Sequence, residues 1–155
     1  TGVQTCALPI WAKSPTPAYR FEGPAIPDAN TISGAPIEAA LGVKGEANAG
    51  MFKITIGRKA TMHGREVSKQ MGVNTWAAFA GSDAAASVDG DFVVTAAELQ
   101  PVLRSLRKSG IYIEAIHSHM TEEQPRYIFL HYWGKGPAAE LAKSLRAALD
   151  LTSRH

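Results

Sequence analysis

The order in which strand-like and helix-like patterns succeed one another between residues 51 and 150 constrains the fold most. Alternating apolar residues predict strands at 52–57, 74–81, 91–95, 111–120 and 125–133. A helix is expected after the third strand and another after the fifth, whereas residues 58–73 show no clear period and are expected to form a long loop. This order predicts an α+β domain, an antiparallel β-sheet with two or three helices packed on one face.

Both long helices carry clear start signals. Thr95 and Glu98 have the spacing of a capping box, in which the two side chains bind the free amides of the first helical turn. Pro137 precedes a helix whose apolar stripe contains Ala138, Leu141, Leu145 and Ala148. A shorter helix is expected from Pro36 to Gly42. We therefore place a single α+β domain at residues 36–152.

The residues before this domain divide into two segments. Residues 1–10, TGVQTCALPI, match the translation of a common DNA-sequencing adapter, and we interpret them as a non-native scar outside the fold. Residues 11–35 are rich in proline and are expected to form an arm or linker. Cys6, in the scar, is the chain's one cysteine, so a Cys-ligated metal or a Cys nucleophile is excluded. We expect the natural N-terminus, and any signal peptide, to be missing.

Composition excludes two classes of partner. The 155 residues carry a net charge of +2, and no basic stripe is interleaved with aromatic residues, which argues against nucleic-acid binding. No apolar run is long enough to span a bilayer, so no transmembrane segment is expected in this chain. With 45% hydrophobic and 19% charged residues, the composition is that of an ordinary globular domain.

Three of the five histidines lie in HSHMTEEQPRYIFLH, residues 117–131. Side chains alternate between the faces of a strand, so His117 and His119 share one face. If 111–120 and 125–133 form a hairpin centred near residue 124 or 125, His131 lies opposite His117 or His119. Three imidazoles could then hold one divalent transition metal, Zn, Cu or Fe, with an open position. The alternative is a set of structural or acid/base histidines without metal.

Two further residues could assist such a site. Glu123 completes the spacing His-x-His-x3-Glu of the first cupin metal motif, so a cupin-like β-barrel is the alternative fold, although two well-signalled helices argue against it. His63 lies in a loop beside Gly64, which permits an unusual turn, and could act as a fourth ligand or a general base. A solvated loop histidine is the simpler interpretation.

Two other residues could contact a ligand. Arg126 could bind an anionic ligand or form a surface salt bridge, and Trp76 could line a core or a pocket.

Three segments, GREVSKQMGVNTWAAFAG, VDGDFVVTAAELQPVLRSLRKSGI and HSHMTEEQPRYIFLHYWGKG, resemble the bacterial LppY/LpqO lipoprotein family, a largely uncharacterised group. The resemblance covers residues 36–150 and implies an extracytoplasmic protein, periplasmic, secreted or lipid-anchored. It also implies that certain residues sit at family motif positions, namely His63, Asn74, Trp76, His117, His119, Glu123, Arg126 and His131. Ser118 stands where the family pattern has asparagine. No reaction follows from the resemblance.

Three functional hypotheses remain open from the sequence. The first is a mononuclear metalloenzyme, either a metal-dependent hydrolase or a copper/iron oxidoreductase, with Glu123 and His63 as catalytic residues and Asn74, Trp76 and Arg126 contacting a ligand. The second is a non-catalytic periplasmic module that binds a metal or small ligand, and the third is a structural domain. The exposed strand edges of a small sheet also suggest a homodimer.

Overall fold

The computed structural model describes residues 24–48 and 50–153 of the chain. Its centre is an antiparallel six-stranded sheet in the order β1-β2-β5-β6-β8-β7. The strands are β1 (Gly45–Asn48), β2 (Met51–Gly57), β5 (Asn74–Gly81), β6 (Ala86–Val94), β7 (Tyr112–His117) and β8 (Ile128–Gly136). The first and last strands in this order each have one neighbour, so the sheet is open and has two edges.

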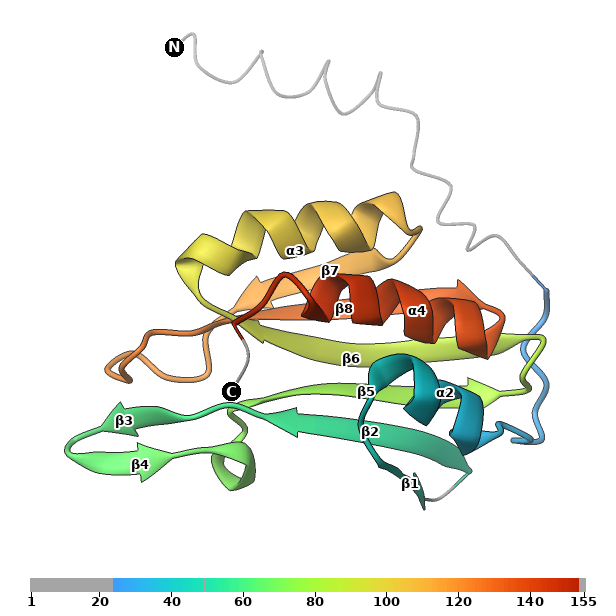
Figure 1. Ribbon diagram of the computed structural model, residues 1–155, viewed down its shortest axis with the longest axis horizontal. Helices are drawn as coiled ribbons and strands as arrows, with labels where there is room; N and C mark the ends of the chain where they lie inside the picture. The colour runs from blue at the N-terminus through green and yellow to red at the C-terminus, as the bar shows by residue number, and fades with distance from the viewer. Residues whose placement is uncertain (1–23, 49, 154–155) are drawn as a thin grey trace, which may run out of the picture.

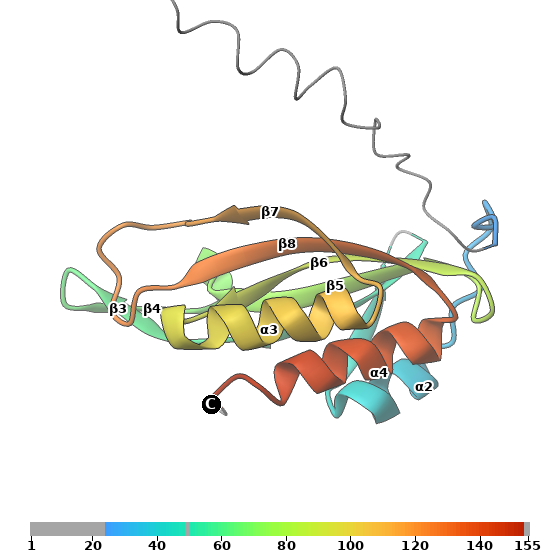
Figure 2. The same cartoon turned by 90° about the horizontal axis from the view of Figure 1, so that it is seen from above.

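Three helices cover one face of this sheet, and no α-helix of the described residues lies over the other face (Figures 1 and 2). They are α2 (Gly34–Leu41), α3 (Ala96–Lys108) and α4 (Ala138–Leu149). Buried side chains of the central strands, such as Phe92 and Tyr132, pack with helical residues such as Leu106 and Leu145 in the main core. The predicted α+β class is therefore confirmed, and the open sheet rules out the cupin-like barrel.

The helix starts follow the sequence signals. At the start of α3, the amide of Thr95 donates to the carboxylate of Glu98 at 2.8 Å, which completes the capping box with the Thr95 side chain. Pro137 precedes α4, and the apolar stripe predicted for that helix is buried. α2 begins two residues earlier than expected and ends at Leu41, and the expected stop residue Gly42 follows it with a φ of 71° that suits glycine.

The segment expected to be a long loop, residues 58–73, instead contains regular structure. β3 (Ala60–Met62) and β4 (Arg65–Val67) form a two-stranded hairpin, and a 3-10 turn follows at Lys69–Met71. The hairpin turns at His63 and Gly64, which both have positive φ, as the favoured two-residue turn requires. Three-residue strands are too short to show a period, so the pattern could not predict them.

β3 and β4 extend beyond one end of the sheet, beside the loop between β7 and β8 (Figure 1). Thr61 and Gln124 exchange two backbone hydrogen bonds of 2.7 and 2.8 Å, which join the hairpin to that loop. The same end of the molecule contains a second apolar cluster, made of Ala60, Val67, Val73, Val93, Tyr127 and Phe129. This end of the molecule therefore has its own small core, on the side of the sheet away from the helices.

Part of the predicted arm is attached to the domain. Thr31 donates a backbone hydrogen bond of 2.7 Å to Gly81, and Ser33 binds the carboxylate of Asp83 through both its amide and its hydroxyl. These two bonds lower the pKa of Asp83. The predicted scar and the first part of the arm, residues 1–23, lie outside the described residues.

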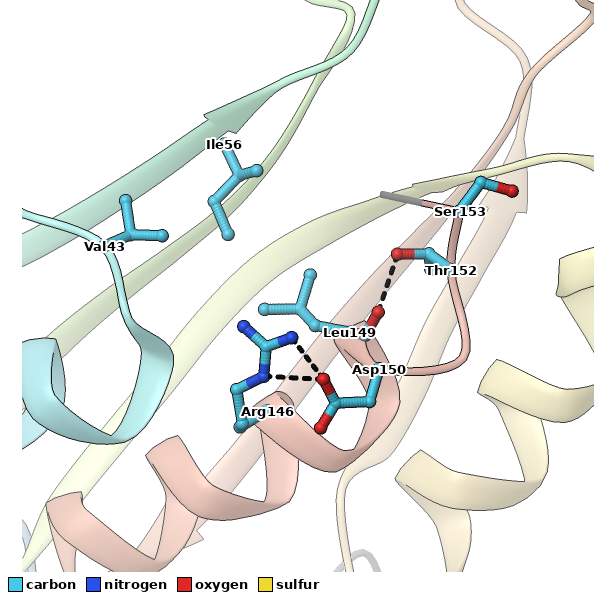
Figure 3. Close-up of a pocket in the computed structure, with 7 residues that line it drawn as sticks. All are labelled: Val43, Ile56, Arg146, Leu149, Asp150, Thr152 and Ser153. Atoms are coloured by element: carbon cyan, nitrogen blue, oxygen red, sulfur yellow. Dashed lines mark hydrogen bonds and ion pairs between the residues drawn. The ribbon is translucent and has the colours of Figure 1, made fainter. Parts of the chain in front are cut away.

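A hollow on the helix side of the sheet lies between β2 and the end of α4. Its volume is about 560 Å³, and Figure 3 shows its lining: Val43, Ile56, Arg146, Leu149, Asp150, Thr152 and Ser153. Arg146 is turned toward Asp150, with which it forms an ion pair. Within the described part of the chain, no helix has both the length and the apolar character needed to cross a membrane.

Candidate metal centre

Asp91, His117 and His119 bring three metal-ligating side chains together. One ligand atom from each lies within 4.8 Å of the ligand atoms of the other two. Asp91 belongs to β6, His117 ends β7, and His119 lies two residues further on, in the loop that leads to β8. Asp91 is buried, His117 is half-buried and His119 is exposed, so the group opens to solvent at His119.

The strand alternation places this group on the face that the helices leave uncovered. Phe92 and Val94 point into the main core beneath the helices, whereas Val93 belongs to the second cluster. Asp91 has the same parity as Val93 and therefore points to the uncovered face. A carboxylate in a central strand is unusual, since aspartate is depleted in strands, and here it is only 7% exposed.

The ring of His119 is held from two sides. It stacks on Phe129, with ring centroids 3.5 Å apart and planes inclined by 14°. Its Nδ1 lies 3.3 Å from the carbonyl oxygen of Gly72, which follows the 3-10 turn with a φ of 80°. Because a carbonyl only accepts hydrogen bonds, this contact places the proton on Nδ1 and leaves Nε2 of the neutral ring as a lone pair.

That lone pair faces His117. The Nε2 atoms of His117 and His119 lie 3.1 Å apart. Two ligands with metal–nitrogen bonds of about 2.0–2.1 Å would be separated by about 2.9 Å at a right angle and about 3.3 Å in a tetrahedron. The observed separation therefore fits two neighbouring ligands of one ion.

Two buried atoms of the group lack partners. Asp91 Oδ1 and His117 Nδ1 have no hydrogen-bond partner among residues 24–48 and 50–153. An orphaned buried carboxylate oxygen is costly, because it loses its water and gains no bond in return. A cation at the group would satisfy Asp91 Oδ1, so the residues present fit a bound metal ion.

The structure separates His131 from the two histidines with which it was grouped. In the sheet it lies opposite Ala115, and His117 lies opposite Phe129, so the expected pairing of His131 with His117 or His119 is wrong. The strands end at His117 and resume at Ile128, which leaves a ten-residue connection in place of a short turn. This connection makes its own contacts with β3, and the chain therefore leaves the ladder earlier than a tight hairpin would.

His131 instead lies between two carboxylates. Its Nδ1 is 3.4 Å from Asp91 Oδ2, and its Nε2 is 3.1 Å from Asp89 Oδ1. Trp76 lies beside it, with ring centroids 6.3 Å apart, and the Lys53 ammonium lies over the Trp76 ring. His131 thus adjoins the metal group through Asp91 and stands outside the set of three.

Glu123 is buried beside the second cluster, outside the group. It is 1% exposed, and its Oε1 accepts a hydrogen bond of 3.0 Å from the amide of Tyr127. Its Oε2 is buried and has no hydrogen-bond partner within the described ranges. The first oxygen therefore orders the loop between His119 and β8, and Glu123 is not a member of the group formed by Asp91, His117 and His119.

The other predicted site residues are distributed around the group. His63, at the tip of the β3–β4 hairpin, pairs with Glu122 at 3.2 Å, and both side chains are well exposed. Asn74 donates to the carbonyl of Lys69 at 3.1 Å and so supports the turn that precedes Gly72. Arg126 lines a cavity of about 340 Å³ whose other walls are Ala96, Ile116, His117, Ser118 and Ile128.

The charges of Asp89 and Asp91, on the uncovered face, also affect the pKa of Tyr132 on the opposite face of the sheet. Tyr132 is fully buried on the helix side, and its hydroxyl donates to the carbonyl of Trp76 at 2.9 Å. Burial, with smaller contributions from the charges of Asp89 and Asp91, raises the pKa of this phenol well above its usual value. Tyr132 therefore remains a neutral donor that joins β8 to β5 behind the metal group.

Asp91 and Gly72 were not predicted from the sequence. A signal for Asp91 existed, because Asp89 and Asp91 share one face of a strand that otherwise carries apolar residues. Its neighbourhood to the histidines, however, depends on the strand order β6-β8-β7, which alternation alone does not give. Gly72 acts through its carbonyl oxygen, and no side-chain pattern reports that.

Fold and site together define an open-sheet α+β domain with a two-histidine, one-carboxylate group on its uncovered face. Residues 35–151 match the model of the family described as Domain of Unknown Function (DUF1259), and the chain belongs to that family. No curated protein and no solved structure matches the chain.

Proposed function

We propose that this protein binds one divalent transition metal ion through Asp91, His117 and His119. The observation that carries the proposal is the buried, unpartnered Asp91 Oδ1 in a group with two imidazoles whose Nε2 atoms are 3.1 Å apart. Two imidazoles and a carboxylate form the ligand set of zinc hydrolases and of non-haem iron oxygenases. Zn²⁺ and Fe²⁺ are therefore the metals that we favour, ahead of the copper that three histidines would suit.

The proposed activity is that of a mononuclear metalloenzyme, a metal-dependent hydrolase with zinc or an oxidoreductase with iron. When bound, the ion would supply a Lewis acid or a redox centre with open coordination positions. Asp91, His117 and His119 would be the three protein ligands of this ion. A substrate can approach it on the exposed side of His119.

One observation favours a non-catalytic metal- or ligand-binding module as the second candidate. The two residues predicted to be catalytic have other contacts: Glu123 binds the Tyr127 amide, and His63 pairs with Glu122 on the surface. Neither belongs to the metal group. If the protein is an enzyme, its proton transfers therefore pass through water or through groups of the substrate.

The Arg126 cavity supports a place for an anionic group of a substrate. Arg126 is exposed, and its guanidinium can bind a carboxylate or phosphate in bidentate fashion. The same cavity is lined by His117, a member of the metal group, and by the small polar side chain of Ser118. Its walls Ala96, Ile116 and Ile128 lie toward the helix side of the sheet, whereas Asp91 points to the uncovered face, so the cavity adjoins the metal group through His117 alone.

The extracytoplasmic location is a separate proposal that rests on the resemblance to the LppY/LpqO lipoprotein family. The proposed metal site does not depend on this location. The proposed homodimer rests instead on the exposed strand edges of the sheet.

Metal binding is tested on purified chain stripped with a chelator and reloaded with Zn²⁺ or, without oxygen, Fe²⁺. We expect one ion per chain by elemental analysis, and its loss in Asp91→Asn and in the His117→Ala/His119→Ala double variant. His63→Ala is the matched control, since it removes an exposed histidine outside the group. Circular dichroism of each metal-free variant checks the fold. Less than a tenth of an ion per wild-type chain, or equal binding by Asp91→Asn, would refute the proposal.

Catalysis is tested on the same variants. A screen of ester, phosphoester and oxidase substrates should show an activity that follows the bound metal and disappears with His117→Ala/His119→Ala. Stoichiometric metal without any metal-dependent turnover would favour the binding module.

A further inference from the structure

We infer that His131 is a positioning residue that fixes the orientation of the Asp91 carboxylate toward the proposed metal. This inference rests on the proposed function and assigns His131 a role other than that of a third imidazole ligand. The two carboxylate oxygens of Asp91 have different surroundings. One oxygen, Oδ2, contacts His131 Nδ1 at 3.4 Å, whereas the other, Oδ1, is buried and unpartnered.

The carboxylate has few other constraints. Its flat group can rotate about the bond that joins it to the side chain, and this terminal torsion is broad for aspartate. Among described side chains, His131 is the hydrogen-bonding neighbour of Asp91. The contact at 3.4 Å is longer than the usual 2.7–3.2 Å of a hydrogen bond, but it is made to Oδ2 and not to Oδ1, so it distinguishes the two orientations of the carboxylate.

His131 can do this because its own position is fixed. Asp91 and His131 lie directly opposite each other on β6 and β8. On the far side of the imidazole, Nε2 lies 3.1 Å from Asp89 Oδ1, and the Trp76 ring packs beside it. The ring is therefore held by a carboxylate and an aromatic neighbour, and its Nδ1 is directed at Asp91.

The consequence for the metal follows from how outer partners act. A hydrogen-bonded neighbour keeps a ligand in the orientation that binds the ion, and its removal typically lowers metal affinity by about 10–100-fold. Loss of a true ligand has a larger effect and also changes the coordination geometry. The two roles of His131 can therefore be distinguished.

The experiment uses the full chain and Co²⁺, whose visible absorption reports the number and kind of ligands. Affinity is measured by competition with a chromophoric chelator for wild type, His131→Ala, His131→Asn and the control His63→Ala. Asparagine is the conservative variant, since its amide N–H can take the place of Nδ1–H. Thermal unfolding of the metal-free variants monitors folding.

We expect His131→Ala to bind Co²⁺ about 10–100-fold more weakly while it keeps the band positions of wild type, because the ligands are unchanged. His131→Asn should recover at least part of this loss, and His63→Ala should equal wild type.

Three results would overturn the inference. Affinity of His131→Ala within twofold of wild type shows that Asp91 needs no such support. A shift of the Co²⁺ bands to those of a lower-coordinate ion shows that His131 is a ligand. An equal loss in His131→Asn, with an unchanged unfolding temperature, shows that donation to Asp91 is not the reason. In all three the wild-type protein still binds metal, so the proposed function stands; if wild type binds none, both fail.

Discussion

The buried ion pair between Arg58 and Glu98 yields a stability prediction with a defined pH dependence. Glu98, in the first turn of α3, is 7% exposed, and Arg58 is 5% exposed. The carboxylate receives two bonds from Arg58, at 2.6 and 3.3 Å, and one each from the amides of Thr95 and Ser153, at 2.8 and 2.7 Å. The pair therefore joins the segment just after β2 to α3 and to the segment after α4.

We predict that Glu98→Gln lowers the free energy of unfolding at pH 7 by about 3 kcal/mol. Breaking a buried pair typically costs about 3–5 kcal/mol, because the remaining charge is buried without compensation. The lower end applies here, since Arg58 keeps its 3.1 Å bond to the carbonyl of Val93 and glutamine keeps an acceptor. For a domain of this size the melting temperature should fall by about 10 °C.

The sign of the pH dependence follows from the pKa. Burial acts to raise the pKa of Glu98, but the bonds from Arg58, Thr95 and Ser153 outweigh it and hold the pKa far below its usual value of 4.5. The folded chain therefore binds fewer protons at this group than the unfolded chain. Its contribution is complete above the unfolded pKa and is lost as the pH falls below about 5.

Urea unfolding of wild type and Glu98→Gln at pH 7, 5 and 3 measures this directly. We expect the difference between them to shrink steadily below pH 5. Glu140→Gln is the matched control, because Glu140 also lies in the first turn of a helix but forms an exposed pair with Lys143, worth at most about 1 kcal/mol. A Glu98→Gln loss below 1 kcal/mol at pH 7, or an equal difference at pH 7 and pH 3, would refute the reasoning.

Two further predictions concern the surroundings of the metal group. Gly72→Ala should cost about 1–2 kcal/mol, since φ is 80° there, and should weaken metal binding as well, because strain at this residue displaces the carbonyl oxygen that contacts His119 Nδ1. Chemical unfolding and metal competition check both effects, and unchanged affinity would show that His119 does not depend on Gly72. Arg126→Ala should weaken binding of inorganic phosphate, measured calorimetrically, at least fivefold without changing metal affinity, whereas Arg126→Lys should weaken it less; equal phosphate binding by all three proteins would remove Arg126 from the site.

Much of the fold was predictable because its signals are local. The capping box of Thr95 and Glu98 marks the start of α3 within one turn of chain, and the alternation of residues 74–81 reproduces β5. The hairpin β3–β4 was not predictable, because three residues cannot establish a period. Its position depends on the exchange of bonds between Thr61 and Gln124, which are far apart in the sequence.

The site was predictable only in part, for a related reason. His117 and His119 could be paired because their two-residue spacing fixes a shared face. His131 could not be placed, because its opposite residue depends on where the ladder ends and on the irregularity in β7 between Ile113 and Ala115. Asp91 could be placed beside the histidines only with knowledge of the strand order β6-β8-β7. Local alternation says which face a side chain occupies, and long-range pairing decides its neighbours.

The irregularity in β7 has a consequence for how this protein meets other chains. β7 is an edge strand, and Glu114 lies at the position where its ladder with β8 is interrupted. A bulge and an exposed charge on an outer strand both hinder the addition of a further strand. The edge that carries the metal group is thereby protected against sheet extension, so a dimer would have to use the short β1 edge or a face of the sheet. A dimer formed through the β1 edge would leave the exposed side of His119 accessible to small molecules.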